Sequence, residues 1–449
     1  MIGGTMRSKL SLAALLAAGT VMGSAVSAQA ADFGGDCCAD LEERVAVLEA
    51  TTARKGNRKV SLKIYGHVNQ ALLFWDDGVD SDTYVVDNDH RSTRIGFKGK
   101  AKINSDWSAG YKIELQFESS SSASVEQDDS PGDDGDDADA IGVRKSFMYV
   151  KSKTLGKLSW GLNSVATDDV THDGFVSKTT DHARPDWHYN RAFQLRDADA
   201  GANGAILARD IGDLCGADLS DNDACFDIGS RRNSVRYDTP TFAGFKVSAA
   251  WGENDFWDVA LRYAGEFGDI KVKAAIGYHD FDGDTIGGGS AGVEDREETS
   301  WAGSAGIIHT PTGLFVQGSY RNIEVEDPTV GAIPEADVYY LQAGIKQKWN
   351  SLGATAIWGE YANAEDGYFT ARGVSQANGD AAAFGGTAGD NILSTEMERW
   401  GFGISQWVDA AKMQLYVIYQ HTEIDVTTDG DAANLEDFDN VVVGGSIRF

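Results

Sequence analysis

The most constraining feature of the sequence is a strict two-residue alternation between an apolar face and a charged face. Within residues 257–267, Trp257 and Val259 lie on one face, while Asp258 and Arg262 lie on the other. A period of two places successive side chains on opposite faces of a β-strand. Charged residues that recur on a hidden face are very costly in a dry sandwich core, but they suit the water-filled interior of a wide barrel. The same pattern recurs at 270–278 and 412–420.

The last nine residues, 441–449, follow the same alternation. Val443, Ile447 and Phe449 share one face, and Ser446 and Arg448 share the other. A terminal strand with bare hydrophobic residues would be a hazardous edge in a soluble protein. It becomes acceptable if it pairs with the first strand and closes a barrel whose outer face meets lipid.

From residue 62 onward the chain is expected to form sixteen antiparallel strands, an even number typical of bacterial transmembrane barrels. The expected strands are 62–75, 91–103, 107–118, 143–151, 157–162, 232–238, 245–252, 257–267, 270–281, 300–309, 314–323, 337–349, 352–361, 395–407, 412–423 and 440–449. Short connections alternate with connections that are mostly long and acidic, the longest being 163–231. Such alternation is what a membrane barrel needs, with short turns at the periplasmic end and long loops outside. The sequence therefore predicts an all-β, 16-stranded antiparallel transmembrane barrel over residues 62–449.

Composition agrees with many short strands and excludes one class of partner. The chain has 52 Gly, only 6 Pro and a formal net charge of −30. A nucleic-acid partner is not expected, because phosphate binding requires clustered cations. No stretch after the N-terminal region approaches the 18 consecutive apolar residues of a membrane helix.

The N-terminal region predicts export from the cytoplasm. Basic Arg7 and Lys9 precede an apolar stretch, and Ala28-Gln29-Ala30 is a small-residue cleavage pattern, so residues 1–30 are predicted to be a signal peptide. Residues 31–61 are predicted to hold a short helix at 40–55, which begins with a capping box. Its short apolar stripe is compatible either with a periplasmic trimerisation segment or with a plain amphipathic helix.

The four cysteines suit an oxidising compartment. Cys215 and Cys225 enclose a short acidic loop, and a disulfide between them would contribute about 3 kcal/mol. The adjacent Cys37 and Cys38 could be reduced, bridged to each other or bridged between subunits, and the sequence does not distinguish these states.

The stretch 233–245, Asn-Ser-Val-Arg-Tyr-Asp-Thr-Pro-Thr-Phe-Ala-Gly-Phe, resembles a strand–turn–strand motif of trimeric Gram-negative porins. Gly66, the stretch 94–99 and the terminal Phe449 are also similar, and the segment at 31–61 most resembles that of alphaproteobacterial porins. The resemblance implies a homotrimer of barrels in the outer membrane, in contact with lipid and lipopolysaccharide. It also implies that connection 163–231 folds inward as a constriction loop and that Phe449 is a signal for the outer-membrane assembly machinery.

For such a channel the site would be an electrostatic constriction with a cationic wall opposite an acidic loop. The outward positions of Ile95 and Val235 define which residues point inward. The predicted wall residues are Lys63, Arg94, Lys98, Arg232 and Arg236, and the predicted opposing loop residues are Asp168, Asp169, Asp173, Asp181 and Asp186. Four arginines of the loop would pair with the loop's own aspartates or shift selectivity toward anions: Arg184, Arg191, Arg196 and Arg209.

No motif for catalysis or for a cofactor is present: the sequence lacks a nucleophile elbow, a phosphate-binding loop and an HExxH pattern. The acidic stretch 128–139 does not match the EF-hand template, so a solvated loop is favoured over a Ca²⁺ site, and no metal site is predicted. The predicted function is passive diffusion of small hydrophilic solutes and ions through an outer-membrane pore. A substrate-specific channel and a surface adhesion or structural barrel remain the alternatives.

Overall fold

The computed structural model describes most of the chain beyond residue 59. The described residues are 60–117, 119–127, 141–174, 182–184, 186–187, 189–196, 203–208, 231–253, 255–283, 296–326, 335–367, 391–430 and 434–449. The predicted signal peptide at 1–30 and the predicted helix at 40–55 lie outside these residues.

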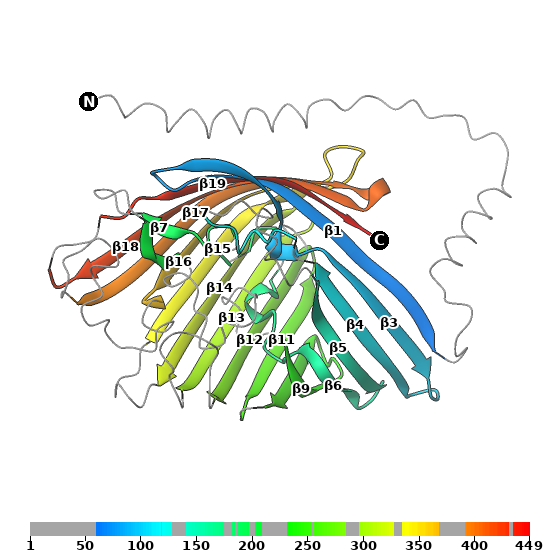
Figure 1. The fold of residues 1–449 in the computed structure, drawn as a ribbon. Coiled ribbons are helices and arrows are strands. Elements are labelled where there is room, and N and C mark those ends of the chain that lie inside the picture. Colours follow the sequence, from blue (N-terminus) through cyan, green and yellow to red (C-terminus); the bar gives the residue numbers. More distant parts are fainter. Residues whose placement is uncertain are drawn as a thin grey trace, which may run out of the picture.

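Sixteen strand positions form one closed antiparallel barrel (Figure 1). The strands are β1 (Ser61–Asp76), β3 (Arg94–Lys102), β4 (Ser108–Phe117), β5 (Ile141–Ser152), β6 (Gly156–Ser164), β9 (Arg231–Asp238), β10 (Phe245–Gly252), β11 (Trp257–Phe267), β12 (Ile270–Gly283), β13 (Arg296–His309), β14 (Leu314–Glu326), β15 (Glu335–Gln347), β16 (Thr355–Glu365), β17 (Ile392–Val408), β18 (Met413–Thr428) and β19 (Phe438–Arg448). Each of the sixteen expected strands is confirmed. Several extend beyond their expected bounds at the long-loop end, where alternation continues with acidic outward residues such as Asp425.

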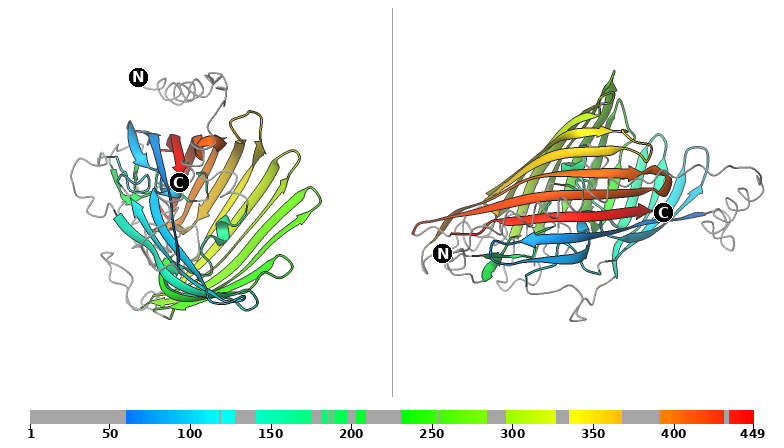
Figure 2. Two further views of the ribbon diagram at one scale, coloured as in Figure 1. Left: turned by 90° about the vertical axis from the view of Figure 1, so that its right-hand side faces the viewer. Right: turned by 90° about the horizontal axis from the view of Figure 1, so that it is seen from above.

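The barrel closes where its first and last strands meet. β1 pairs with β19 in register from His67 opposite Arg448 to Asp76 opposite Asp439, and the two strands lie side by side in both figures (Figures 1 and 2). The backbone of Phe449 continues this ladder, because its N–H donates to Gly66 O at 3.0 Å and its own carbonyl accepts from Gly66 N at 3.2 Å. The expectation that the terminal strand closes the barrel is therefore correct.

Two parts of the strand prediction were wrong. The connection 163–231 was expected to be a loop, but it contains a short antiparallel pair, β7 (Gln194–Arg196) and β8 (Asn203–Leu207). Residues 76–90 were expected to be a long loop, but they contain a further strand, β2 (Ser81–Asp87). β2 pairs with the second half of β1, from Gln70 to Asp76, and β3 pairs with the first half, from Ser61 to His67. β2 and β3 therefore share one strand position in the barrel. The short turn at Gly78 allows the chain to fold straight back onto β1, since Gly78 has a positive φ of 85°.

The two faces of the strands differ as the alternation requires. The outward face carries exposed apolar side chains that include Val68, Leu72, Val259, Leu261, Ile276, Ile307, Leu341, Ile357 and Phe402. The opposite face carries polar side chains such as Gln317, Gln342, Glu360 and Gln420, all buried. An apolar outer band with a polar interior is the arrangement of a barrel that crosses a lipid bilayer.

Tight turns at the short-connection end need glycine at defined positions. Gly244 and Gly313 have positive φ values of 88° and 71°. A Cβ atom at Gly313 would lie 1.9 Å from Lys346 O, so a larger residue there is excluded without movement of the backbone.

Candidate functional site: the inner wall of the barrel

Three predicted wall residues lie on inward-facing positions of neighbouring strands. Lys63 of β1 is directly opposite Lys98 of β3, and Arg94 is at the start of β3. Lys98 Nζ lies 4.9 Å from the ring centroid of Tyr65, which is also inward-facing, and so forms a cation–π contact.

A buried carboxylate, Glu114, lies among three cations of this wall. Glu114 of β4 lies 2.9 Å from Lys112 Nζ, 3.6 Å from Arg144 Nε and 3.9 Å from Arg94 NH1. Tyr65 donates a hydrogen bond of 2.7 Å to the same carboxylate. We call Glu114, Lys112, Arg144 and Arg94 the Glu114 group. Three cations around one carboxylate leave the group with a formal charge of +2.

A β-bulge brings two successive basic residues of β5 to this wall. The register between β4 and β5 shifts between Glu114, which faces Lys145, and Leu115, which faces Val143. The extra residue in a bulge breaks the alternation and changes the direction of its side chain. Arg144 therefore contacts Gln116 and Glu114, while Lys145 contacts Ser164 Oγ at the end of β6.

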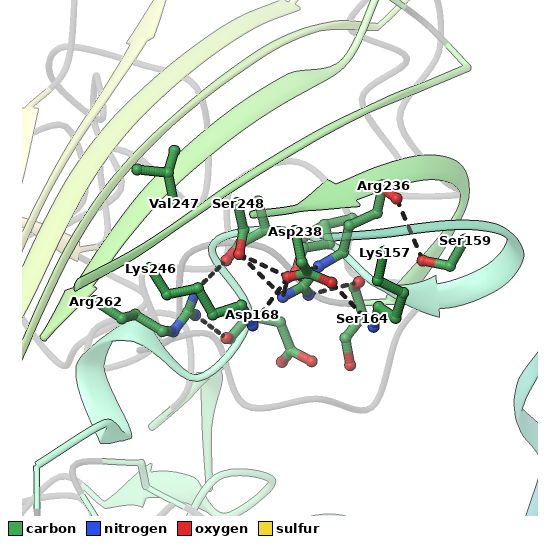
Figure 3. Close-up of polar contacts among 12 residues, drawn as sticks. Lys157, Ser159, Ser164, Asp168, Arg236, Asp238, Lys246, Val247, Ser248 and Arg262 are labelled. Atoms are coloured by element: carbon green, nitrogen blue, oxygen red, sulfur yellow. Dashed lines mark hydrogen bonds and ion pairs between the residues drawn. The ribbon is translucent and has the colours of Figure 1, made fainter. Parts of the chain in front are cut away.

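The other two predicted wall residues have different surroundings. Arg232 lies over the rings of Phe281 and Phe256, 4.3 Å and 5.0 Å from their centroids. Arg236 NH2 lies 2.8 Å from Asp238 Oδ1, and its NH1 donates to the carbonyls of Ser164 and Val165. Arg236 therefore joins strand β9 to the start of the connection that follows β6 (Figure 3).

The first described part of that connection, residues 165–174, contacts the inward face of β11 through Arg262, which the alternation places inward but which was not among the predicted wall residues. Arg262 donates to the carbonyls of Ala166 and Asp168, each at 2.7 Å, and pairs with the Asp173 carboxylate. Asp169 has a left-handed backbone with φ of 68°, and its carboxylate is 65% exposed and lies 4.0 Å from His172 Nδ1. Asp168, Asp169 and Asp173 therefore lie close together beside β11.

The second part of the connection contacts β17 through another arginine that the prediction missed. Arg399 donates to Asp186 O at 2.6 Å and to Arg184 O at 2.8 Å, and its guanidinium lies 4.6 Å from the Trp187 ring. The buried Asp186 carboxylate lies 3.2 Å from His172 Nε2, and this contact links the two parts of the connection. Arg191 is also buried, whereas Asp181 lies outside the described residues.

The second part also fills one side of the interior with apolar and aromatic side chains. Trp187, Tyr189 and Phe193 of the connection are about 1% exposed and pack against inward-facing residues. We call these surroundings the packed side; its inward-facing residues include Leu73, Trp75, Val338, Tyr340, Trp358, Met397, Tyr416, Ile418 and Val442.

His182 joins this packing to the strands that close the barrel. Its ring stacks on Tyr416 of β18 with centroids 4.0 Å apart, and its Nε2 lies 3.5 Å from Ser446 Oγ of β19. Burial, and then the charges of Arg91 and Arg184, hold the pKa of His182 well below its usual value. The imidazole is therefore neutral at pH 7.

The inner-wall residues that were not among the predicted wall residues fall into two kinds. Arg262, Lys112 and Glu114 lie on inward positions of regular strands, so the alternation alone identifies them as facing the interior. Arg144 could not be found in this way, because a bulge that shifts the register leaves no period-two signal.

Several other predicted features cannot be placed. Cys215 and Cys225, and the acidic stretch 128–139, lie outside the described residues. Within the part of the chain that the structure describes, no group of three metal-ligating side chains is found, and no helix there is long and apolar enough to cross a membrane.

The fold and the polar inner wall define a class of protein, the channel-forming β-barrels of bacterial outer membranes. The sequence profile of the Gram-negative porin family matches residues 11–446. The chain belongs to this family, and it is an outer-membrane porin.

Solved structures with the same fold are distant in sequence. The anion-selective porin from Comamonas acidovorans superposes with a TM-score of 0.55 at 15% identity, covering 87% of this chain and 100% of that chain. The trimer form of OmpT, an outer membrane protein of Vibrio cholerae, gives a TM-score of 0.50 at 15% identity, with 87% and 99% covered. No curated protein is detectably similar in sequence.

Proposed function

We propose that this porin lets small hydrophilic solutes and ions diffuse passively through a passage along its charged side. By the charged side we mean the inward-facing residues of β3–β6 and β9–β11. The observation that carries the proposal is the exposure of its cations: the side chains of Lys112, Lys157 and Lys246 are 27%, 30% and 34% exposed. Cations that line an interior and still meet water mark the route that a hydrated solute can take.

Connection 163–231 acts as the constriction loop in this proposal. Arg262 and Arg399 lie on separate strands and bind the backbone carbonyls of its two described parts. Hydrogen bonds from charged donors to carbonyls are among the stronger ones, so they hold the loop across the interior. Asp168 and Asp169 would then border the passage opposite the cations of the wall.

The charge of the wall favours anions. The Glu114 group has three cations for one carboxylate. The formal charge of the whole chain is −30, but charge outside the passage acts on an ion only weakly, since salt screens it within about 10 Å. One structure with this fold is titled an anion-selective porin, which supports the same direction.

The assembly is proposed to be a homotrimer in contact with outer-membrane lipid and lipopolysaccharide, and one structure with this fold is titled as a trimer form. Residues 1–30 serve as the signal peptide, 31–61 as a short periplasmic helical segment and 62–449 as the barrel. Phe449 serves as the recognition signal for the assembly machinery; its side chain is 58% exposed on the outward face. Catalysis is not part of the proposed function.

Single-channel recording in a planar bilayer tests the proposal. Openings in groups of three, with a reversal potential under a salt gradient that shifts in Arg94→Ala or Asp169→Ala, are expected. Openings that neither substitution affects would reject those two residues as part of the passage. Folded barrels without conductance would reject the diffusion function and favour the adhesion alternative.

A further inference from the structure

A second carboxylate-centred group of cations lies apart from the Glu114 group, at the short-turn end of the charged side. Asp238 is the last residue of β9, next to the turn that leads into β10, and it is 3% exposed. Lys157 Nζ lies 2.9 Å from its Oδ2, while Lys246 Nζ and Arg236 NH2 lie 3.0 Å and 2.8 Å from its Oδ1. The three cations come from β6, β9 and β10 and converge on one carboxylate (Figure 3).

The structure gives this group an excess of positive charge. Among the described residues, Asp238 is the one carboxylate within ion-pair distance of Lys157, Lys246 and Arg236. One negative and three positive charges leave a formal charge of +2. Ser248 Oγ donates a further hydrogen bond of 2.7 Å to Asp238 and fixes the carboxylate without changing that charge.

The three cations differ in what they can offer to a solute. Arg236 is 11% exposed and donates to Asp238 and to the carbonyls of Ser164 and Val165, so its donors are directed to the protein. The two lysine side chains are 30% and 34% exposed. An ammonium group has three N–H donors, and each lysine makes an ion pair with Asp238 alone among the described carboxylates. The lysines are therefore held in place and still meet water.

We propose that Lys157 and Lys246, positioned by Asp238 and Arg236, form an anion-binding station at the end of the passage opposite the long loops. The station takes small oxyanions, such as phosphate or a solute that carries a carboxylate, because two adjacent ammonium groups bind an oxyanion as point charges. It rests on the proposed function, since a station is useful only where a passage exists. In the proposed orientation it faces the periplasm, so an anion leaving the Glu114 group meets a second positive site before release.

Position in the sheet explains why the group forms. Lys157 is directly opposite Asp238 in the ladder between β6 and β9, and Ser248 is opposite Asp238 in the ladder between β9 and β10. Cross-strand neighbours on one face approach within contact distance. Lys246, two residues before Ser248 on the same face of β10, reaches Asp238 diagonally.

Block of the chloride current by inorganic phosphate tests the station. Phosphate added on the short-turn side is expected to reduce single-channel chloride current in the native protein. The double variant Lys157→Gln/Lys246→Gln should weaken the apparent phosphate affinity about tenfold, since one charge removed about 6 Å from an anion in water changes binding roughly threefold. If the double variant does not fold, as judged by its heat-shifted electrophoretic mobility, each single variant should show the threefold effect.

Two further variants separate charge from structure. Lys271→Gln removes a lysine at the same end of the barrel, but Lys271 is paired one to one with Glu266, so phosphate block should be unchanged. Lys246→Arg keeps the charge and should keep the block. Phosphate block that is equally strong in the double variant, or equally weakened in Lys246→Arg or Lys271→Gln, would overturn the station. If the folded native protein conducts no current at all, the proposed function is overturned instead.

Discussion

The packed side and the charged side belong to one barrel and follow one alternation, yet their interiors differ in their access to water. On the packed side, the side chains of Arg399 and Glu360 are 1% and 0% exposed. On the charged side, the exposed fraction of the Lys112, Lys157 and Lys246 side chains is between 27% and 34%. A charged side chain that faces the interior is therefore not necessarily exposed to water.

The difference arises from what covers each side. Trp187 and Tyr189 of the connection lie on the packed side, where hydrogen bonds such as that from Asn88 Nδ2 to Tyr189 Oη, at 2.8 Å, replace water. Buried polar groups are stable only when they are satisfied in this way. On the charged side the cations surround carboxylates but keep part of their surface in water. One inner wall thus has a structural half that holds the connection and a half that can serve solutes.

The largest expected effect is a loss of stability of the connection on the packed side. Trp187→Ala removes an aromatic side chain that is 1% exposed and should destabilise the packed connection by about 4 kcal/mol. Hydrogen exchange of the backbone amides at 189–196 should accelerate accordingly, and single-channel conductance should rise as water enters this side.

Trp251→Ala is the matched control, because Trp251 is 52% exposed on the outward face. Its amide exchange at 189–196 should match the native rate. Unchanged exchange in Trp187→Ala would mean that the connection is not held by its packing.

The same chemical change should alter ion selectivity on the charged side and not on the packed side. Glu360 accepts hydrogen bonds from Tyr340 Oη at 2.9 Å and Gln420 Nε2 at 2.7 Å beside Arg399. Glu360→Gln leaves the buried guanidinium of Arg399 without that negative charge, which should cost about 3 kcal/mol of stability. Ion selectivity should not change.

Glu114→Gln, in contrast, should change ion selectivity. It raises the formal charge of the Glu114 group from +2 to +3 beside water, so anion selectivity should increase roughly threefold. Reversal potentials under a salt gradient, combined with denaturation of the folded barrel, measure both quantities. Selectivity that changes equally in the two variants would contradict the division of the wall into two halves.

The strands could be predicted from sequence because alternation is a local property. The sixteen expected strands match, since each contains its own period-two signal, as at Trp257 and Asp258. The strand β2 was missed because its residues, Ser81–Asp87, mix polar and apolar positions without a clear face.

The division of the interior depends on contacts between residues far apart in the chain. His182 and Ser446 illustrate this, because no spacing in the sequence brings them together. A partial signal did exist: in residues 71–75, Ala-Leu-Leu-Phe-Trp, both faces are apolar. A strand that is apolar on its inward face as well needs a dry partner inside the barrel, and here that partner is the connection.

The smallest expected effect is a pH dependence confined to the packed side. His182 has a folded-state pKa well below its usual value of 6.5, because burial and the nearby charges of Arg91 and Arg184 disfavour the imidazolium. When the connection detaches, the ring regains water and binds a proton more readily. Packing of the connection is therefore fully favoured above pH 6.5 and weakens by about 1.4 kcal/mol for each pH unit below it. Amide exchange at 189–196, corrected for its intrinsic pH dependence, should reveal this between pH 7.5 and pH 5.5.

The variant His182→Gln should lose the dependence while the conductance of the charged side stays the same. An undiminished dependence in His182→Gln would assign it to other groups, among which the pair of His172 and Asp186, 3.2 Å apart, is the first to examine.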